Sequence, residues 1–319
     1  MKNHTRPEYT MRENKIPQSE PVPDWKEARE LWGAAWEFHW IGFGLAFSVL
    51  AVSSSVALVQ ANKRNMFGRK PYVVAINSLL LILGITRALY LLIDPYESKQ
   101  NGIKMPKWVA QFLFNIAFPC LTSSFGLIFL VFLRVAKLQL VSAKLDNARY
   151  LIAVILIHFA IVVVADIAAA CNYSNVHILF IICQLFFIIW GLLLSATFIY
   201  SGLKVIYRAK NVQKQLETQS AANTSKVAKV TIGTSCLGLC ITALQLYSLV
   251  DVYRFYSDFT DPPPWSWWVF QTCSRLLEVA MACTIAYSVM KPSTPKRKLT
   301  VKQTILRDEK TAIEEGIIN

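Results

Sequence analysis

Long apolar stretches alternate with short polar segments over most of this 319-residue chain. A helix that crosses the hydrocarbon core of a bilayer needs about 20 mostly apolar residues. Lipid offers no hydrogen bonds to the backbone, so the spanning segment must pair its own N–H and C=O groups, as a helix does. The pattern therefore predicts an all-α membrane protein with seven transmembrane helices. The expected spans are residues 36–60, 72–93, 108–135, 150–171, 176–206, 230–252 and 265–290.

These spans divide the chain into three parts: a polar N-terminal tail (1–34), a seven-helix domain (35–290) and a basic C-terminal tail (291–319). The N-terminal tail lacks the short apolar core of a cleaved signal peptide, so none is expected. Pro119 inside the third span predicts a kink that nearby hydroxyl side chains relieve. The basic stretch 204–229 is expected to be a solvated loop.

The distribution of Lys and Arg predicts the orientation of the chain, because basic residues are retained on the cytosolic side. The segments after the first, third, fifth and seventh spans hold 19 of them, or 21 with Arg134 and Lys204 at the ends of the third and fifth spans, whereas those after the second, fourth and sixth hold 4. The N-terminus is therefore expected outside the cytosol and the C-terminus inside.

Composition supports a membrane location, since 54% of the residues are hydrophobic and only 17% are charged. The net charge of +13 is then better explained by contacts with anionic lipid headgroups than by nucleic acid. No disulfide-bonded ectodomain is expected, because all seven cysteines lie in or beside the apolar stretches. The residues expected to contact anionic headgroups are Lys63, Arg64, Arg69, Lys70, Lys296, Arg297 and Lys298.

Six polar side chains are predicted to share the outer leaflet: Glu37, His39, Arg87, Asp166, Arg275 and Glu278. Ionisable groups are costly within hydrocarbon and mark either pairing between helices or a functional cavity. Arg275 and Glu278 lie three residues apart on one helix face, so they can pair with each other or with neighbouring helices. Two interpretations stay open, structural pairing or a site for a small ligand or ion. Under both, Arg87 should face the interior with a carboxylate within reach.

The remaining candidate groups do not assemble into a catalytic or metal site. Four scattered histidines cannot supply a haem or zinc site, and His158 is expected to make an interhelical hydrogen bond. The sequence contains neither a phosphate-binding glycine loop nor a nucleophile elbow. We therefore expect no enzymatic activity and no cofactor. The acid-Arg-Tyr and Asn-Pro-x-x-Tyr patterns of G-protein-coupled receptors are also missing from the sequence.

Several short motifs in the first three spans resemble the membrane domain of the proline-rich transmembrane proteins 3 and 4. They are the run Trp32 to Gly42 (WGAAWEFHWIG), Gly84 to Ala88 (GITRA), Asp94-Pro95-Tyr96, Met105-Pro106 and Pro119-Cys120-Leu121. The resemblance covers residues 32–200 by motif and the rest by topology. It implies a multi-pass membrane domain with no established ligand.

Vertebrate members of that family carry a long Pro-rich extracellular region, whereas only Pro7, Pro17, Pro21 and Pro23 precede this domain. An ectodomain function is therefore not expected. The function indicated is a receptor-like or scaffolding module in a membrane, whose outer polar residues bind a small ligand or ion. The alternative is a transporter or lipid-handling protein, which would need a polar route to the cytosolic side.

Overall fold

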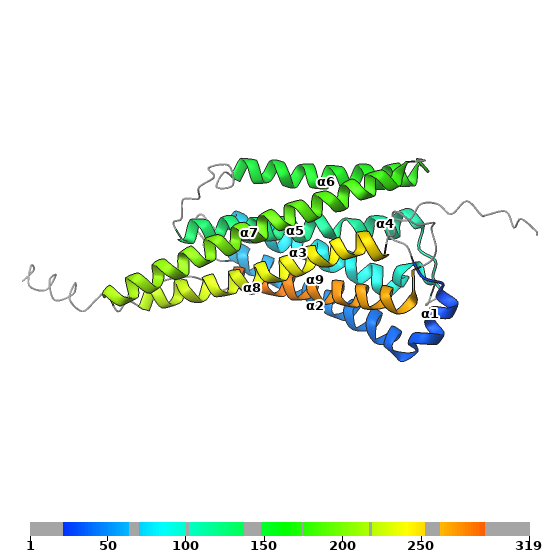
Figure 1. Ribbon diagram of the computed structural model, residues 1–319, viewed down its shortest axis with the longest axis horizontal. Helices are drawn as coiled ribbons and strands as arrows, with labels where there is room; N and C mark the ends of the chain where they lie inside the picture. Colours follow the sequence, from blue (N-terminus) through cyan, green and yellow to red (C-terminus); the bar gives the residue numbers. More distant parts are fainter. Residues whose placement is uncertain are drawn as a thin grey trace, which may run out of the picture.

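The structure is a computed structural model, and every regular element in its described part is helical (Figure 1). Seven of the described helices are long and apolar enough to cross a membrane, which confirms the predicted fold class. The described residues are 22–63, 70–99, 102–136, 148–173, 175–216, 219–252 and 262–290. The elements are α1 (Trp25–Trp32), α2 (Ala34–Lys63), α3 (Lys70–Ile93), η1 (Pro95–Glu97), α4 (Lys107–Asn115), α5 (Ala117–Ala136), α6 (Ala148–Ala170), α7 (Val176–Leu216), α8 (Gln219–Tyr247), η2 (Ser248–Val252) and α9 (Pro264–Met290).

Helices α4 and α5 together form the third span, which occupies the centre of the bundle. It is 89% buried, whereas the spans made by α2, α6 and α7 are each buried by a third or less. On those outer helices large apolar side chains are exposed, among them Val49 at 68% and Leu156 at 63%. Lipid rather than water is the solvent that suits such a surface.

The third span is broken one turn before Pro119, as the predicted kink requires. Helix α4 ends at Asn115 and α5 begins at Ala117. Proline has no N–H to donate to the carbonyl four residues earlier, and its ring crowds that carbonyl. The Thr122 hydroxyl lies 3.1 Å from the Phe118 carbonyl oxygen, and the Ser124 hydroxyl donates to the Cys120 carbonyl at 2.8 Å.

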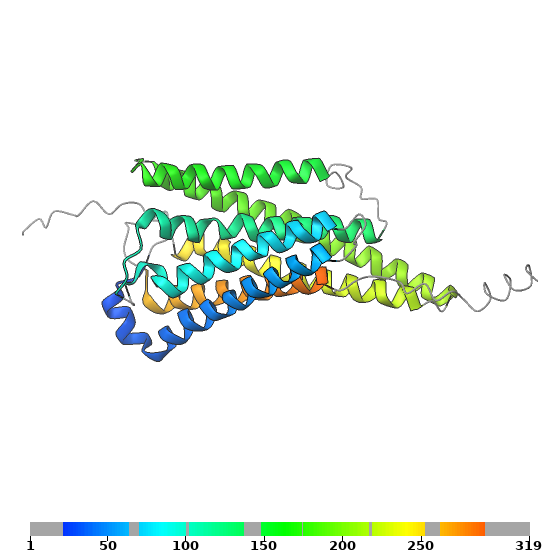
Figure 2. The same ribbon diagram turned by 180° about the vertical axis from the view of Figure 1, so that it is seen from behind.

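Two regions differ from the sequence-based expectation. Within the predicted polar tail, residues 25–32 form α1, which Asp24 caps by accepting a hydrogen bond from the Lys26 N–H at 2.8 Å. The predicted basic loop is largely helical, because α7 continues to Leu216 and α8 begins at Gln219. Figures 1 and 2 show these two helices projecting together beyond the bundle at the end opposite α1.

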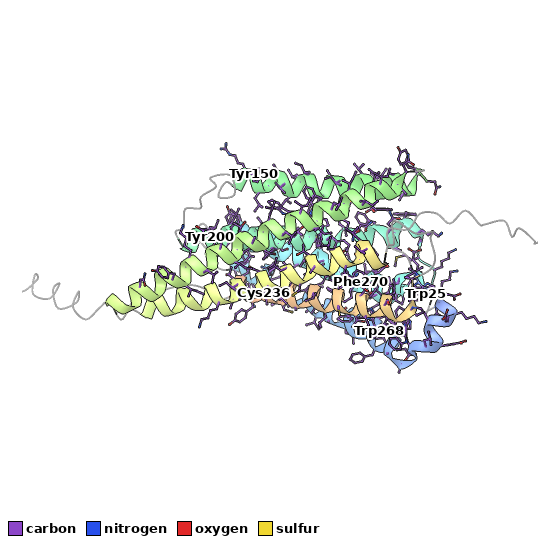
Figure 3. All side chains as sticks on the ribbon, viewed as in Figure 1. Trp25, Tyr150, Tyr200, Cys236, Trp268 and Phe270 are labelled. Atoms are coloured by element: carbon purple, nitrogen blue, oxygen red, sulfur yellow. The ribbon has the colours of Figure 1, made fainter. Side chains whose placement is uncertain are left out.

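The end of the bundle at which α1 lies, called the α1 end below, is closed by aromatic side chains. The rings of Trp25 and Trp32 lie 5.4 Å and 5.7 Å from that of Trp267 on α9. Figure 3 labels Trp25 and Trp268 at this end and Tyr200 toward the other. The Arg29 guanidinium donates to the Ser98 carbonyl, which ties α1 to the connection between α3 and α4.

The residues expected to contact anionic lipid fall partly within the described ranges. Lys63 ends α2 and Lys70 begins α3, and both are exposed at the end opposite α1. Their contact with headgroups stays a prediction. The other five, Arg64, Arg69, Lys296, Arg297 and Lys298, lie outside the described residues.

Candidate functional site

Three of the predicted polar residues form a buried ion cluster between α3 and α9, called the ion triad below. The Glu278 carboxylate accepts hydrogen bonds from Arg87 Nε at 3.0 Å and Nη2 at 2.8 Å, and from Arg275 Nη1 at 2.5 Å. The side chains are almost fully enclosed, with Arg87 at 0%, Arg275 at 1% and Glu278 at 4% exposure. The hypothesis that Arg87 faces the interior beside a carboxylate is therefore confirmed.

The sequence places the triad's groups correctly because their helix spacing is fixed. Arg275 and Glu278 lie three residues apart, so both side chains leave α9 on the same face. From α3, Arg87 reaches this face with its guanidinium in a bidentate arrangement, the geometry in which arginine binds a carboxylate best. The third nitrogen of Arg87, Nη1, donates to the Phe114 carbonyl on α4 at 2.9 Å. The triad thus joins three helices.

His39 extends the triad to α2 through a tyrosine. His39 Nε2 lies 3.0 Å from the Tyr96 hydroxyl, which accepts a hydrogen bond from Arg275 Nε at 3.2 Å. The other ring nitrogen of His39 lies 2.9 Å from the Thr272 hydroxyl on α9. One connected network therefore crosses α2, η1, α9 and α3 at the α1 end.

The remaining two predicted residues do not join the triad. Glu37 lies on the exposed side of α2, and no ion pair reaches it from the described residues. Asp166 on α6 is buried but faces α4, where its Oδ1 accepts hydrogen bonds from Asn115 Nδ2 at 2.6 Å and Gln111 Nε2 at 3.3 Å. The expected single cluster of six is therefore wrong, because Glu37 faces outward on α2 and because α6, which carries Asp166, packs on α4, α5 and α7.

The triad has no room for a ligand. Each guanidinium nitrogen of Arg87 is already bonded, and the rings of Phe114 and Phe118 lie 4.9 Å and 5.1 Å from its Cζ. Buried charges that are paired with each other and hydrogen-bonded at every nitrogen hold helices in register. Of the two interpretations, the geometry favours structural pairing for Arg87, Arg275 and Glu278.

A separate cavity of about 50 Å³ lies between α4, α5, α6, α7 and α8. Its polar lining comes from Asn115, His158, Cys183, Gln184 and Gln245. The rings of Phe114, Phe118, Phe180 and Phe187, with Val162 and Ala165, complete the wall. Since a water molecule needs about 10–15 Å³ of such space, the cavity can hold a few waters or a small ligand.

His158 joins α6 to α5 at this cavity. Its Nδ1 lies 3.1 Å from the Thr122 hydroxyl, so the expected interhelical hydrogen bond is present. Its Nε2 is buried and has no hydrogen-bond partner among the described residues, and neither has Oδ2 of Asp166. Other buried side-chain atoms of the described residues also have no partner, but these two lie at the cavity and beside it, which makes the cavity and its border the candidate binding site.

Comparison with known proteins assigns the chain to a family. The family model described as "Proline-rich transmembrane protein 3 domain" matches residues 10–304. The chain belongs to this family. The resemblance noted in the sequence is thereby confirmed, and the GITRA and Asp-Pro-Tyr motifs that carried it supply Arg87 and Tyr96 to the buried network.

Relatives of this chain include the proline-rich transmembrane protein 4 of Mus musculus and of Homo sapiens. The mouse protein is 28% identical over 88% of this chain and 33% of its own length. The human protein is 27% identical over 85% of this chain and 30% of its own length. The chain thus spans about a third of these relatives. No solved structure matches it. The family and the apolar helices make it an integral membrane protein.

Sequence reasoning about this domain missed the uncharged groups of the site. Gln111 and Asn115 are four residues apart within an apolar stretch, and Gln184 and Gln245 are isolated amides in two others. A search restricted to ionisable residues passes over them, although amides within a membrane helix are also costly and seek partners. The four-residue spacing of Gln111 and Asn115 places both amides on one helix face, and this signal could have identified them.

Proposed function

We propose that the chain is a receptor-like membrane module that binds a small ligand in the cavity between α4 and α8. The observation that carries the proposal is the continuity of α7 and α8. Both line the cavity, through Cys183, Gln184 and Gln245, and both run from there to the projecting end of the molecule. At 1.5 Å per residue, the 41 residues of α7 span about 62 Å.

The ion triad holds one part of the helix bundle rigid, as a receptor-like module requires. It ties α3, α4 and α9 together, while His39 and Tyr96 add α2 and the connector. Helix α6 carries no member of the triad and packs at the edge of the bundle (Figure 1). An occupant of the cavity would therefore shift α6, α7 and α8 relative to the helices that the ion triad holds together. A ligand can change the balance between two conformations only if it contacts them differently, and such a shift provides that difference.

An aromatic layer below the cavity argues against the alternative of a transporter. The Phe198 ring on α7 lies 4.7 Å from that of Phe125 and 4.4 Å from that of Phe129, both on α5. All three side chains are 1% exposed. Because these rings fill the space between α5 and α7, they favour binding over passage of a polar substrate.

The experiment that tests the proposal fills the cavity with a side chain. Ala165→Leu adds three carbons at the cavity wall, and Ala160→Leu adds the same group on the exposed side of α6. Spin labels on Leu203 of α7 and Val56 of α2, both exposed, report movement at the far end. We expect the label distance to change in Ala165→Leu and to stay as in the parent in Ala160→Leu. Identical distances in both variants would contradict a receptor-like role and leave a scaffold.

A further inference from the structure

Three of the polar lining groups, on Asn115, Gln184 and His158, offer hydrogen-bond acceptors to the cavity, and this follows from the partners already bound. Gln245 is the exception, because its Oε1 accepts from Gln184 Nε2 at 3.2 Å and its amide nitrogen is the group that remains. Asn115 uses its amide nitrogen to donate to the Asp166 carboxylate at 2.6 Å. A carboxylate only accepts, so the orientation of the Asn115 amide is fixed and its Oδ1 is the atom left for the cavity.

The orientation of the Gln184 side-chain amide is also fixed by its partners. Its Nε2 lies 3.2 Å from the Gln245 backbone carbonyl and 2.8 Å from the Ser248 hydroxyl. A backbone carbonyl can only accept, so the amide nitrogen of Gln184 must face α8 and η2. Its carbonyl oxygen, Oε1, is then the atom that the wall of the cavity offers to a ligand.

Thr122 favours one tautomer of His158, because its single hydroxyl proton can serve only one of two contacts. The Thr122 oxygen lies 3.1 Å from the Phe118 carbonyl oxygen, 3.3 Å from that of Pro119 and 3.1 Å from His158 Nδ1. Both kinds of contact are hydrogen bonds when the hydroxyl donates to a carbonyl and accepts from a proton on Nδ1, and we assign that tautomer because it satisfies the most groups. The neutral ring then presents an unprotonated Nε2, the buried atom that has no described partner.

The carboxylate of Asp166, beside the cavity, also favours a hydrogen-bond donor or a cation. Asp166 accepts from two amides, yet no cation pairs with it among the described residues, and its Oδ2 has no partner there. The ion triad, with two guanidinium groups and one carboxylate, carries a formal excess of one positive charge, but among the described residues both arginines pair with Glu278 and neither with Asp166. A buried carboxylate is stabilised by a cation that reaches it.

The apolar wall also suits a cation. Four phenylalanines line the cavity, and the face of an aromatic ring attracts a positive charge. The rings of Phe114 and Phe118 already lie beside the Arg87 guanidinium, so Phe180 and Phe187 are the rings left for a second cation. The volume of about 50 Å³ limits the enclosed group to the size of a few waters, or about three non-hydrogen atoms. Quaternary ammonium groups have no N–H to donate to these acceptors.

From these observations we infer that the cavity binds a small primary ammonium group, held by acceptors on Asn115, His158 and Gln184 and by the charge of Asp166. This inference rests on the proposed function, because it names the ligand class of the same site. The ammonium group belongs either to a free amine or to the ethanolamine headgroup of a lipid. With about three enclosed atoms, the affinity of a minimal probe should be about millimolar.

The test measures thermal unfolding of the purified full-length chain in detergent with ethylammonium chloride, at constant ionic strength. Ethanol replaces the ammonium with a neutral group, and tetramethylammonium keeps the charge but lacks N–H donors. We expect the unfolding midpoint to rise with ethylammonium and not with the other two. Equal shifts with ethanol would overturn the assignment of a cation while leaving a ligand cavity in place.

Variants locate the binding. Asp166→Asn removes the charge and should weaken the apparent affinity about tenfold or more, whereas Glu37→Gln removes an exposed carboxylate and should leave it unchanged. If Asp166→Asn does not fold, Ala165→Leu fills the cavity and keeps Asp166, with Ala160→Leu as its control. An ethylammonium shift that persists in Ala165→Leu would place the binding elsewhere and overturn the inference.

The source of the ammonium group is separated in lipid nanodiscs. If phosphatidylethanolamine in a phosphatidylcholine disc raises the midpoint and abolishes the ethylammonium effect, the lipid headgroup is the occupant. If the ethylammonium effect survives, a free amine is the occupant. An absence of any ethylammonium effect in the parent protein would overturn the ligand class, and the label-distance experiment would still decide the receptor-like role by itself.

Discussion

At the scale of single residues, the ion triad shows how a membrane interior accommodates charge. One carboxylate, Glu278, pairs with two guanidinium groups, and each guanidinium nitrogen that does not bond to it donates to a backbone or side-chain oxygen. Burial of these groups is costly, so the network contributes register rather than large net stability. Removing one member is a different matter, because it leaves the others buried and uncompensated.

Glu278→Gln should therefore be strongly destabilising. The substitution leaves Arg87 and Arg275 enclosed without a counter-charge, and breaking a buried pair in this way costs about 3 kcal/mol or more. The measurement is unfolding of the purified protein in detergent, followed by heat or denaturant. Glu37→Gln, which neutralises an exposed carboxylate, serves as the control and should change stability by less than about 0.5 kcal/mol. Equal stability of the two variants would show that the triad does not hold the helices.

The sequence predicted most of this network and misplaced the rest for one reason. Arg275 and Glu278 were paired by helix spacing, and Arg87 and His39 by their depth in the membrane. Depth is a property of the chain order, but the rotation of each helix about its axis is not. Glu37 and Asp166 have the right depth and face other directions, which only packing decides.

At the scale of the elements, close contact between α2 and α3 depends on a missing side chain. A Cβ atom at Gly84 would lie 2.8 Å from the Ala51 backbone nitrogen and 2.9 Å from the Phe47 carbonyl oxygen. These are backbone atoms, so they cannot rotate away. Small residues at such positions let membrane helices approach closely, where dispersion and interhelical contacts replace the hydrophobic effect.

Gly84→Ala should separate these two helices and cost about 1–3 kcal/mol of stability, as overpacking does in other interiors. Gly42→Ala on α2 is the matched control, because a Cβ atom there meets nothing within 4 Å. That variant should be neutral or gain up to about 1 kcal/mol from helix propensity. Thermal unfolding of both variants in the same detergent provides the comparison, and a loss at Gly42 equal to that at Gly84 would refute the packing argument.

Two elements escaped prediction because hydropathy does not distinguish a loop from a polar helix. Helix α1 and the projecting ends of α7 and α8 are rich in polar residues, so they lack the long apolar stretch by which a spanning helix is predicted. For α1 the local signals were Asp24 as a capping residue and tryptophans at both ends, Trp25 and Trp32. Their packing against Trp267, more than 200 positions later in the chain, is a tertiary contact that no local pattern carries.

At the scale of the whole molecule, the orientation in the membrane remains a prediction from charge. The connections at the end opposite α1 carry most of the basic residues, and such residues are retained in the cytosol. This orientation would expose the α1 end and the cavity beside it to the outer leaflet. The projecting helices α7 and α8 would then face the cytosol, as a receptor-like module requires.

Accessibility of terminal epitope tags in intact cells tests this orientation. The N-terminal tag should be detected without permeabilisation and the C-terminal tag only after it. Replacing Lys63, Arg64, Arg69 and Lys70 with Gln should produce a mixed population, because those charges anchor the first cytosolic connection. The matched change of Lys99, Lys104 and Lys107 to Gln should not. Both tags on one side of the membrane would contradict an odd number of spans.

The sequence by itself determined that this protein lies in lipid and is all-α, and it determined the number of spans and the depth of the charged groups along them. These follow from the length of apolar stretches and from the cost of an unpaired backbone in lipid, which act locally along the chain. Only the tertiary structure decided which charges meet, which polar group stays without a partner and where a cavity remains. Those outcomes depend on the rotation and tilt of each helix, which are set by the packing of all its neighbours at once.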